Sequence, residues 1–351
     1  MMSSKTYDAK TLEDFAARLL IADGFTKDEA EATAKSLVLS NLYGHDSHGI
    51  IRVPQYIDMR KRKVVKSGAD IIFEKDDATS ALIDADIGLG QVQMPIILDH
   101  LLEKAKTQSI VCGAVRNIGH TGRLGEWSEY IAMRGYAGLV LNNDNGTVIA
   151  VAPPGSKEPR TSSNPIALGI PLGDNDVFSL DMSTSAVALG KITVAKAGNQ
   201  QMPPNTIQDA QGVITTEPDD YFNGGAALPM GGAQGYKGFG LAMFVDFLTA
   251  GLTGGLTPPA DITSEEAVSN VVITIWNPEK FSGLSHMQHQ ANRFIDFIRA
   301  AEPIDPEKPV RIAGDRSKLC FKERNENGIP LSQGTIDKLN AEAQNFGVDL
   351  I

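Results

Sequence analysis

Apolar residues in the first part of the chain recur at the spacing of helices. Between residues 11 and 23 they form one stripe, and Thr11 with Asp14 fits a capping box at its start. A second helix is predicted to begin at Thr26, with acidic residues in its first turn and an inward face of Ala30, Ala34, Leu37, Val38 and Leu42. The pattern therefore predicts a small helical N-terminal unit.

The rest of the chain alternates between short apolar runs and longer helical patterns. Strands are predicted at 70–75, 80–85, 110–116, 137–142, 148–152, 166–170, 177–180 and 271–276. Helices are predicted at 91–106, 186–197, 241–252, 287–299 and 335–344. A further helix is predicted to follow residue 125 and to run through Trp127, Tyr130 and Ile131. This order indicates an α/β fold of the mixed α+β kind.

Composition narrows the class of protein. A length of 351 residues favours two domains, or one domain with substantial additions. A net charge of -11 argues against a nucleic-acid partner and against an anionic membrane surface. No apolar run approaches the length needed to cross a bilayer, and the N-terminus has no signal core, so a cytoplasmic location is expected. Cys112 and Cys320 have no paired spacing and are interpreted as free thiols.

Chemically active side chains are concentrated between residues 45 and 52. Two histidines, an aspartate, a serine and an arginine fall within these eight positions. Gly44 can close the preceding helix in a left-handed conformation, and Asp46 or Ser47 can cap a new helix. This segment is the first candidate for a functional site.

If residues 48–60 are helical, His48 and Arg52 lie one turn apart on the same face. A proton-transfer group then lies beside a forked cation, which suits a small substrate with a hydroxyl or carbonyl and a carboxylate. Two other interpretations stay open on spacing alone. His48 can be a helix cap or surface residue, or His45, His48 and His120 can hold the metal of a hydrolase.

Two glycine-rich segments, 88–93 and 235–240, suggest a nucleotide or phosphate, because glycine lets backbone N–H groups approach an anion. Neither has the dinucleotide fingerprint, so a standard Rossmann fold is not supported, and a simple tight turn explains each equally well. Lys237, at the start of a predicted helix, would suit a diphosphate or a ribose hydroxyl. His120 follows a strand, where α/β proteins often place functional residues, and Asp181 can orient a histidine or cap a helix.

Several motifs together resemble one enzyme family. In family order, and across almost the whole chain, they are 44–49, 52–56, 117–122, 159–165, 180–185, 190–192, 228–232, 235–241 and 311–316. The set is similar to the malate/L-lactate dehydrogenase family that is distinct from Rossmann-type lactate and malate dehydrogenases. That family also includes sulfolactate and ureidoglycolate dehydrogenases, diketogulonate reductase and cyclic-imine carboxylate reductases.

The resemblance implies an NAD(P)-dependent oxidoreductase that acts on small α-hydroxy or α-keto acids such as malate or lactate. It implies a non-Rossmann cofactor domain built on a mixed sheet, a homodimer, and NAD as cofactor with NADP possible. No metal is required. We expect an N-terminal, substrate-side segment at 1–110, a cofactor-binding domain at 111–265, and a C-terminal segment at 266–351 that returns to the first.

The resemblance also implies roles for single residues. His48 would be the proton donor and acceptor, with Ser47 and Asp181 as its relay. Arg52 would hold the substrate carboxylate, with Ser163 and His120 as further substrate contacts; Ser163 stands where the family more usually has threonine. The cofactor would be lined by His120, Thr121, Gly122, Arg123, Leu124, Asp181, Met182, Ser183, Tyr236, Lys237, Arg311, Gly314, Asp315 and Arg316.

Overall fold

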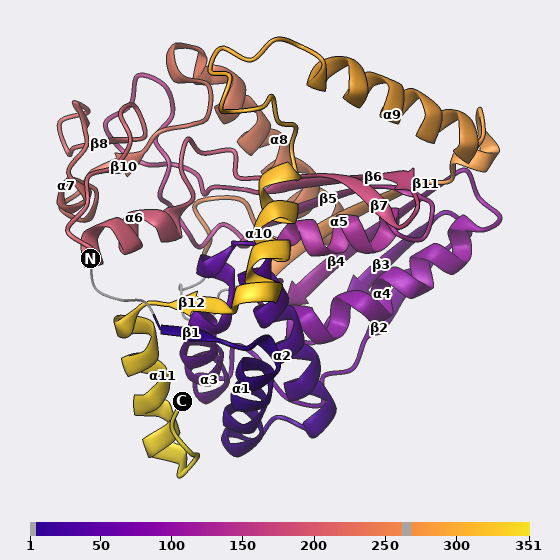
Figure 1. The fold of residues 1–351 in the computed structure, drawn as a ribbon. Coiled ribbons are helices and arrows are strands. Elements are labelled where there is room, and N and C mark those ends of the chain that lie inside the picture. The colour runs from indigo at the N-terminus through magenta and orange to yellow at the C-terminus, as the bar shows by residue number, and fades with distance from the viewer. Residues whose placement is uncertain (1–4, 262–267) are drawn as a thin grey trace.

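A computed structural model describes residues 5–261 and 268–351 (Figure 1). Its α-helices are α1 (Ala9–Asp23), α2 (Lys27–Leu42), α3 (Val53–Lys61), α4 (Gly90–Ala105), α5 (Leu124–Ala132), α6 (Leu189–Ala197), α7 (Pro218–Phe222), α8 (Tyr236–Thr253), α9 (Leu284–Arg299), α10 (Asp315–Asn327) and α11 (Gln333–Phe346). Its strands are β1 (Lys5–Tyr7), β2 (Ile72–Asp76), β3 (Ser80–Asp84), β4 (Ile110–Ile118), β5 (Ala137–Asn143), β6 (Ile166–Gly173), β7 (Asp176–Met182), β8 (Ile207–Gln208), β9 (Ile214–Thr215), β10 (Ala226–Ala227), β11 (Ser269–Trp276) and β12 (Ile329–Leu331).

Seven of these strands form one sheet, in the order β2-β3-β4-β11-β5-β6-β7. Only β3 and β4 run parallel, and helix α4 makes the crossover between them. The late strand β11 pairs antiparallel with both β4 and β5, so it lies in the middle of the sheet. The predicted mixed α/β fold with a mixed sheet is confirmed.

Helices cover both faces of the sheet, and the alternation along β11 shows why. Val271, Ile273 and Ile275 are fully buried in the core that contains residues of α4 and α5. Val272 points to the opposite face and packs with Val245 of α8. In Figure 1, α8 lies above strands β5 and β6, whereas α5 and α4 lie below these two strands.

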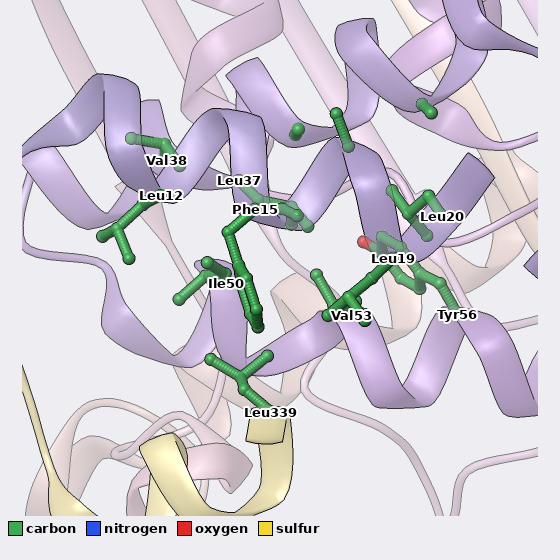
Figure 2. Packing of buried hydrophobic residues seen from close by; sticks show 14 of the residues in the cluster. Leu12, Phe15, Leu19, Leu20, Leu37, Val38, Ile50, Val53, Tyr56 and Leu339 are labelled. Carbon is green, nitrogen blue, oxygen red and sulfur yellow. The ribbon is translucent and has the colours of Figure 1, made fainter. Parts of the chain in front are cut away.

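A separate hydrophobic core joins the two ends of the chain. It is built from α1, α2 and α3, and Leu339 of α11 packs into it, as Figure 2 shows. Strand β1 also pairs with β12. In contrast, β2, β3 and α4 precede residue 110 but belong to the sheet and its core. The domain boundaries at 110 and 265 stay a prediction, and residue 265 lies outside the described residues.

Some predicted elements differ from the observed ones. Helix α1 is capped by Asp8, which accepts from the Thr11 N–H at 3.0 Å, so the capping box expected at Thr11 is wrong. Residues 148–152 form no strand, and Val151 makes only single bridges to Thr161 and Ala227. The chain leaves the sheet just before, where Asn145 has a φ of 55°. No helix in the described part of the chain is long and apolar enough to cross a membrane.

Candidate active site

The backbone from 45 to 52 is not the continuous helix that was expected. It forms two 3-10 turns, η1 (Asp46–His48) and η2 (Ile50–Arg52), and α3 begins only at Val53. Between the turns, Gly49 is extended, with φ -89° and ψ -155°. The Asn41 side chain accepts the Ile50 N–H at 2.8 Å and occupies the space a Cβ at 49 would need. His48 and Arg52 are therefore brought near each other by two tight turns, not by one helix face.

Neither candidate cap residue in this segment caps a helix. The Asp46 carboxylate instead accepts from Arg324 of α10 at 2.6 and 3.0 Å and from the Asn41 amide at 2.7 Å. Arg324 also donates to the Asn41 carbonyl. Helix α10 thus holds segment 45–52, which carries His45 and His48, in place. Gly44, just before this segment, has the expected left-handed conformation, with a φ of 78°.

The His48 ring is held at one of its two nitrogens. Ser47 Oγ lies 3.0 Å from His48 Nδ1, and Nε2 has no hydrogen-bond partner among the described residues. The His48 and His120 rings are stacked, with centroids 5.6 Å apart and planes 16° apart. His120 in turn contacts the buried Tyr56 through its Nδ1, 2.7 Å from Tyr56 Oη. Two imidazoles from distant parts of the chain therefore share one site.

Arg52 is a largely buried cation without an anion. Its Nε donates to the Ser47 carbonyl at 2.6 Å, and its Nη1 donates to Gln55 Oε1. Within residues 5–261 and 268–351, no carboxylate forms an ion pair with it, and burial lowers the pKa of its guanidinium. A buried charge is costly unless it is paired, so this position favours an anionic group from a ligand.

The three histidines of the region are held in their neutral form. Burial, and next the charge of Arg52, lower the pKa of His48 from 6.5 to about 3. Burial also lowers the pKa of His45 to about 4 and that of His120 well below 6.5. A neutral imidazole can accept a proton, and an anion bound to Arg52 would reduce the repulsion that opposes protonation of His48.

Asp181, the third member of the predicted relay, lies at the end of β7. Its carboxylate accepts from the Gly125 N–H at 2.9 Å, at the start of α5, and burial raises its pKa. In the described chain it has no hydrogen bond to Ser47 or His48. The structure thus brings Ser47 and His48 together and places Asp181 against a helix start.

A cavity of about 470 Å³ opens beside this helix start, and three predicted cofactor residues line it: Arg123, Asp181 and Gly314. Arg123 donates twice to Glu129, at 2.8 and 2.7 Å, and its guanidinium lies 4.6 Å from the centroid of the Tyr43 ring. The Arg123 Nε is buried without a partner. His45, Glu126 and Ser179 add polar groups to the same wall.

The remaining predicted residues are spread around this region. Thr121 and Gly122 are buried in the loop between β4 and α5, and Leu124 is buried at the first position of α5. Met182 and Ser183 lie at or just beyond the end of β7. Tyr236 and Lys237 begin α8 and are exposed, as are Arg311 and Arg316. Asp315 pairs with Arg299 at 2.7 Å, and the Ser163 carbonyl accepts from Thr184. In the described chain, none of these residues forms a hydrogen bond with the His48 side chain.

The metal interpretation lacks a ligand set. In the described ranges, no three His, Cys, Asp or Glu side chains are grouped so that they could hold a metal ion. His45 Nε2 lies 3.2 Å from Ser317 Oγ of α10, whereas His48 and His120 stack on each other.

A family model for malate/L-lactate dehydrogenase matches residues 7–340. The chain belongs to the malate/L-lactate dehydrogenase family. It is 32% identical to a malate dehydrogenase of Pyrococcus horikoshii over 96% of this chain and 94% of that protein. The solved structure of the P. horikoshii enzyme superposes with a TM-score of 0.89 and 30% identity, covering 100% of this chain and 98% of the other.

Two further members of the malate/L-lactate dehydrogenase family show its range. Hydroxycarboxylate dehydrogenase B of Escherichia coli K12 is 31% identical, over 99% of this chain and 96% of that protein. A pyrroline- and piperideine-carboxylate reductase of Pseudomonas syringae is 28% identical, over 96% of both. The predicted family is confirmed, and with it the class of a dehydrogenase that acts on CH–OH groups and the need for a nicotinamide cofactor.

Three polar residues of the site were not predicted from the sequence: Gln55, Gln91 and Glu126. Gln91 acts on the site through Tyr56, which is 35 positions away, and through His120 beyond it. Contacts over such separations leave no periodic signal in one sequence. Gln55 and Tyr56 do lie within the family-like stretch 52–56, and Gln91 lies within the glycine-rich segment 88–93.

Proposed function

We propose that this protein oxidises a small α-hydroxy acid, or reduces the matching α-keto acid, with a nicotinamide dinucleotide. The observation that carries the proposal is Arg52, a mostly buried guanidinium with no carboxylate partner in the described chain, close to His48. A substrate carboxylate would supply the missing anion in a bidentate contact. The carbon next to that carboxylate would then lie near the imidazole.

In this proposal, His48 takes the hydroxyl proton during oxidation and returns it during reduction. Its neutral state in the free protein suits the first step. Ser47 orients the ring through Nδ1, which leaves Nε2 for the substrate. Asp181 would join this relay only if the end of β7 moved, because its carboxylate holds the Gly125 N–H.

The wall of the 470 Å³ cavity suits part of a dinucleotide. Arg123 Nε lacks a partner. Gly314 has a φ of 91°, which favours glycine, and a Cβ there would lie 3.1 Å from the Ser179 carbonyl oxygen. Arg123, Asp181 and Gly314 would hold the cofactor there, with Lys237 as a further contact. When bound, the nicotinamide supplies the hydride chemistry. We favour NAD over NADP.

The cofactor choice can be tested with paired assays. Purified protein should oxidise NADH with at least one α-keto acid of a panel that includes pyruvate and oxaloacetate, and should use NADPH less well. Equal or better use of NADPH would contradict the choice of NAD. The absence of turnover with both cofactors over the whole panel would contradict the function.

The role of His48 is tested by His48→Asn, which keeps a polar side chain but cannot exchange a proton near neutral pH. We expect kcat to fall by about 100-fold or more, the usual contribution of general acid–base catalysis. Cofactor affinity, measured by fluorescence titration, should stay within about twofold, because His48 is held by Ser47 and not by the cavity wall. Full turnover in this variant would remove His48 from the mechanism.

The role of Arg52 is tested by Arg52→Lys. The charge remains, but the forked geometry is lost, so KM for the acid should rise more than kcat falls. For a substrate analogue in which an amide replaces the carboxylate, KM should be about the same in the wild type and in Arg52→Lys. If both proteins use the acid equally well, the carboxylate binds elsewhere.

A second candidate substrate is a cyclic imine carboxylate, because a reductase of such compounds is 28% identical over 96% of this chain. Arg52 would hold that carboxylate equally well. Adding 1-piperideine-2-carboxylate to the same panel separates the two. A kcat/KM for the imine far above that for every keto acid would favour this alternative.

We also propose that the protein is a homodimer that pairs through α8. This helix exposes a row of large apolar side chains, namely Tyr236, Met243, Phe244, Phe247 and Leu252. Gly240 and Gly251 lie on the same helix with open space where a Cβ would be, which allows a second helix to approach closely. The family resemblance implies a dimer as well.

A further inference from the structure

The cavity of about 470 Å³ is lined by other residues than those proposed to hold the substrate. It lies where α2, α5, β7 and the start of α10 meet (Figure 1). None of His48, Arg52 and His120 is among the described residues that line it. In the proposed function the nicotinamide has to reach the substrate beside His48. The cavity therefore suits the other end of the dinucleotide, the adenosine, and its volume lies in the range of about 300–1,000 Å³ usual for small-molecule sites.

Among the described residues that line this cavity, both permanent cations are already paired with acids. Arg123 donates to Glu129 at 2.8 and 2.7 Å, and Lys318 donates to Asp176. His45 lines the same wall, but burial lowers its pKa to about 4, so it is uncharged near neutral pH. The buried Arg123 Nε still lacks an acceptor, which a neutral ligand atom would supply. A phosphate in the cavity would find no free positive charge on the described wall.

Two carboxylates of the wall form no ion pair in the described chain. Asp181 accepts from the Gly125 N–H at 2.9 Å, at the positive end of α5. Glu126 accepts only from the neutral Ser36 hydroxyl, at 2.7 Å, so its charge is the less compensated of the two. The Glu126 side chain is partly exposed, and a carboxylate can accept several hydrogen bonds. It can therefore accept a further one from a hydroxyl group in the cavity.

We infer that Glu126 selects NAD over NADP by accepting a hydrogen bond from the 2′-hydroxyl of the adenosine ribose, the position at which NADP carries a phosphate. The inference rests on the proposed function, which needs a nicotinamide dinucleotide. In other dinucleotide sites, a carboxylate that binds this hydroxyl is a common means of binding NAD. A 2′-phosphate would bring about two negative charges against the Glu126 carboxylate, and no described cation of the wall is free to offset them.

The first experiment measures the Kd of NADH and of NADPH by fluorescence titration at pH 8. The wild type should bind NADPH at least about tenfold more weakly than NADH, because like charges would meet. In Glu126→Gln, the Kd of NADPH should fall about tenfold, whereas that of NADH should rise by about threefold or less, since the amide oxygen still accepts from the hydroxyl. Glu103→Gln, at an exposed position of α4, is the control and should keep both Kd values.

The pH dependence of the same titrations separates charge from shape. Burial raises the pKa of Glu126 to about 7, so its carboxyl is mostly protonated at pH 6 and mostly ionised at pH 8. The ratio of the NADPH Kd to the NADH Kd should therefore rise with pH through 7. The 2′-phosphate itself ionises near pH 6, about one unit lower, so Glu126→Gln gives the baseline and its ratio should rise less. The other titratable or charged groups around Glu126 or on the cavity wall are Lys35, Tyr43, His45, Arg123, Glu129, Tyr130, Asp176, Asp181 and Lys318.

A cofactor analogue without the hydroxyl tests the hydrogen bond itself. The wild type should bind NADH with a 2′-deoxyadenosine end about tenfold more weakly than NADH, as for the loss of one hydrogen bond to a charged group. In Glu126→Ala, NADH and the deoxy analogue should bind alike, because the acceptor is gone. Far-ultraviolet circular dichroism checks that Glu126→Ala is folded, and Glu103→Gln should show the wild-type difference between the two nucleotides.

A wild type that binds NADPH as tightly as NADH would overturn the inference, although a dinucleotide-dependent reaction would stand. A Glu126→Gln protein that keeps the wild-type ratio of the two Kd values would also overturn it. An equal loss of affinity for the deoxy analogue in the wild type and in Glu126→Ala would place the adenosine ribose away from Glu126. If the wild type binds neither NADH nor NADPH, the proposed function itself fails, and the inference fails with it.

Discussion

Burial of the His48 imidazole and the nearby charge of Arg52 set the pH dependence of the proposed reaction. Together they lower the pKa of the ring from 6.5 to about 3 in the free protein. Oxidation needs the neutral ring, which dominates at every pH above that value. Reduction needs the protonated ring, whose population falls about tenfold for each pH unit above the pKa.

We therefore expect kcat/KM for the hydroxy acid to show no His48 limb between pH 5 and 8, on the free-enzyme pKa of about 3. Over the same range, kcat/KM for the keto acid should fall as pH rises. Initial rates in both directions at constant ionic strength measure this. A limb near 6.5 in the oxidation profile would mean that His48 is not held neutral. Arg52→Gln should move the protonation of His48 to higher pH, because the nearest cation is removed.

The pKa of Glu126 is shifted upward, and this shift affects the stability of the folded protein. Burial raises the pKa of its carboxyl from 4.5 to about 7, although Ser36 donates to it at 2.7 Å. The folded protein therefore binds this proton more tightly than the unfolded chain does. The stabilisation is complete below pH 4.5 and is lost as pH rises through 7.

Glu126→Gln should remove the loss of stability that the wild type shows as pH rises through 7. The amide oxygen can still accept from Ser36, and no charge is buried at high pH. We expect the free energy of unfolding at pH 8 to rise by about 1–3 kcal/mol over the wild type, with little change at pH 5. Urea unfolding at both pH values measures it, with the exposed Glu103→Gln as control. A variant that is less stable than the wild type at pH 8 would contradict the assignment.

Helix α2 carries the segment with the histidines, and its first turn is held by a compact set of hydrogen bonds. Thr26 and Glu29 form a capping box, and Glu29 also accepts from Ser67 and from the Gly68 N–H. Thr26→Ala should lower the free energy of unfolding by about 1–2 kcal/mol, as for other lost caps. Thr26→Ser keeps the hydroxyl and should cost much less. Because the helix start is far from His48, kcat should not change; an equal loss in both variants would assign the effect to packing.

Elements with a local signal could be predicted from the sequence, and elements fixed by distant contacts could not. The stripe and cap of α2 and the apolar runs of β4 to β7 were predictable because burial repeats along them. Helix α10 was missed because it has no fully buried side chain and therefore no apolar stripe, yet its Arg324 fastens Asp46. The helix expected from His48 to Arg52 is interrupted because Asn41 occupies the space beside Gly49.

The same division holds for the site. The spacing suggested that His48 lies beside Arg52, the position after a strand suggested His120, and the family resemblance implied their roles. The sequence could not show that His120 stacks on His48 or that Tyr56 and Gln91 lie behind it, because those contacts join α3, α4 and the loop after β4. Nor could it show that Asp181 binds Gly125.

The proposed dimer makes a prediction for the molecule as a whole. In a two-fold dimer, α8 would pack against its own copy, so each substitution on its exposed face enters the interface twice. The wild type should have a mass near twice 37.6 kDa by light scattering at micromolar concentration. Phe247→Glu, at a side chain that is 62% exposed, should yield monomers, because two carboxylates would meet in an apolar contact.

Phe222→Glu, at an exposed phenylalanine of α7, is the matched control and should remain dimeric. The exposed start of α8 also carries Tyr236 and Lys237, which we placed near the cofactor. The monomeric Phe247→Glu protein should therefore bind NADH more weakly while its far-ultraviolet circular dichroism stays that of the wild type. A Phe247→Glu protein that is still dimeric would assign the interface to another face. A monomeric wild type would contradict the proposed dimer.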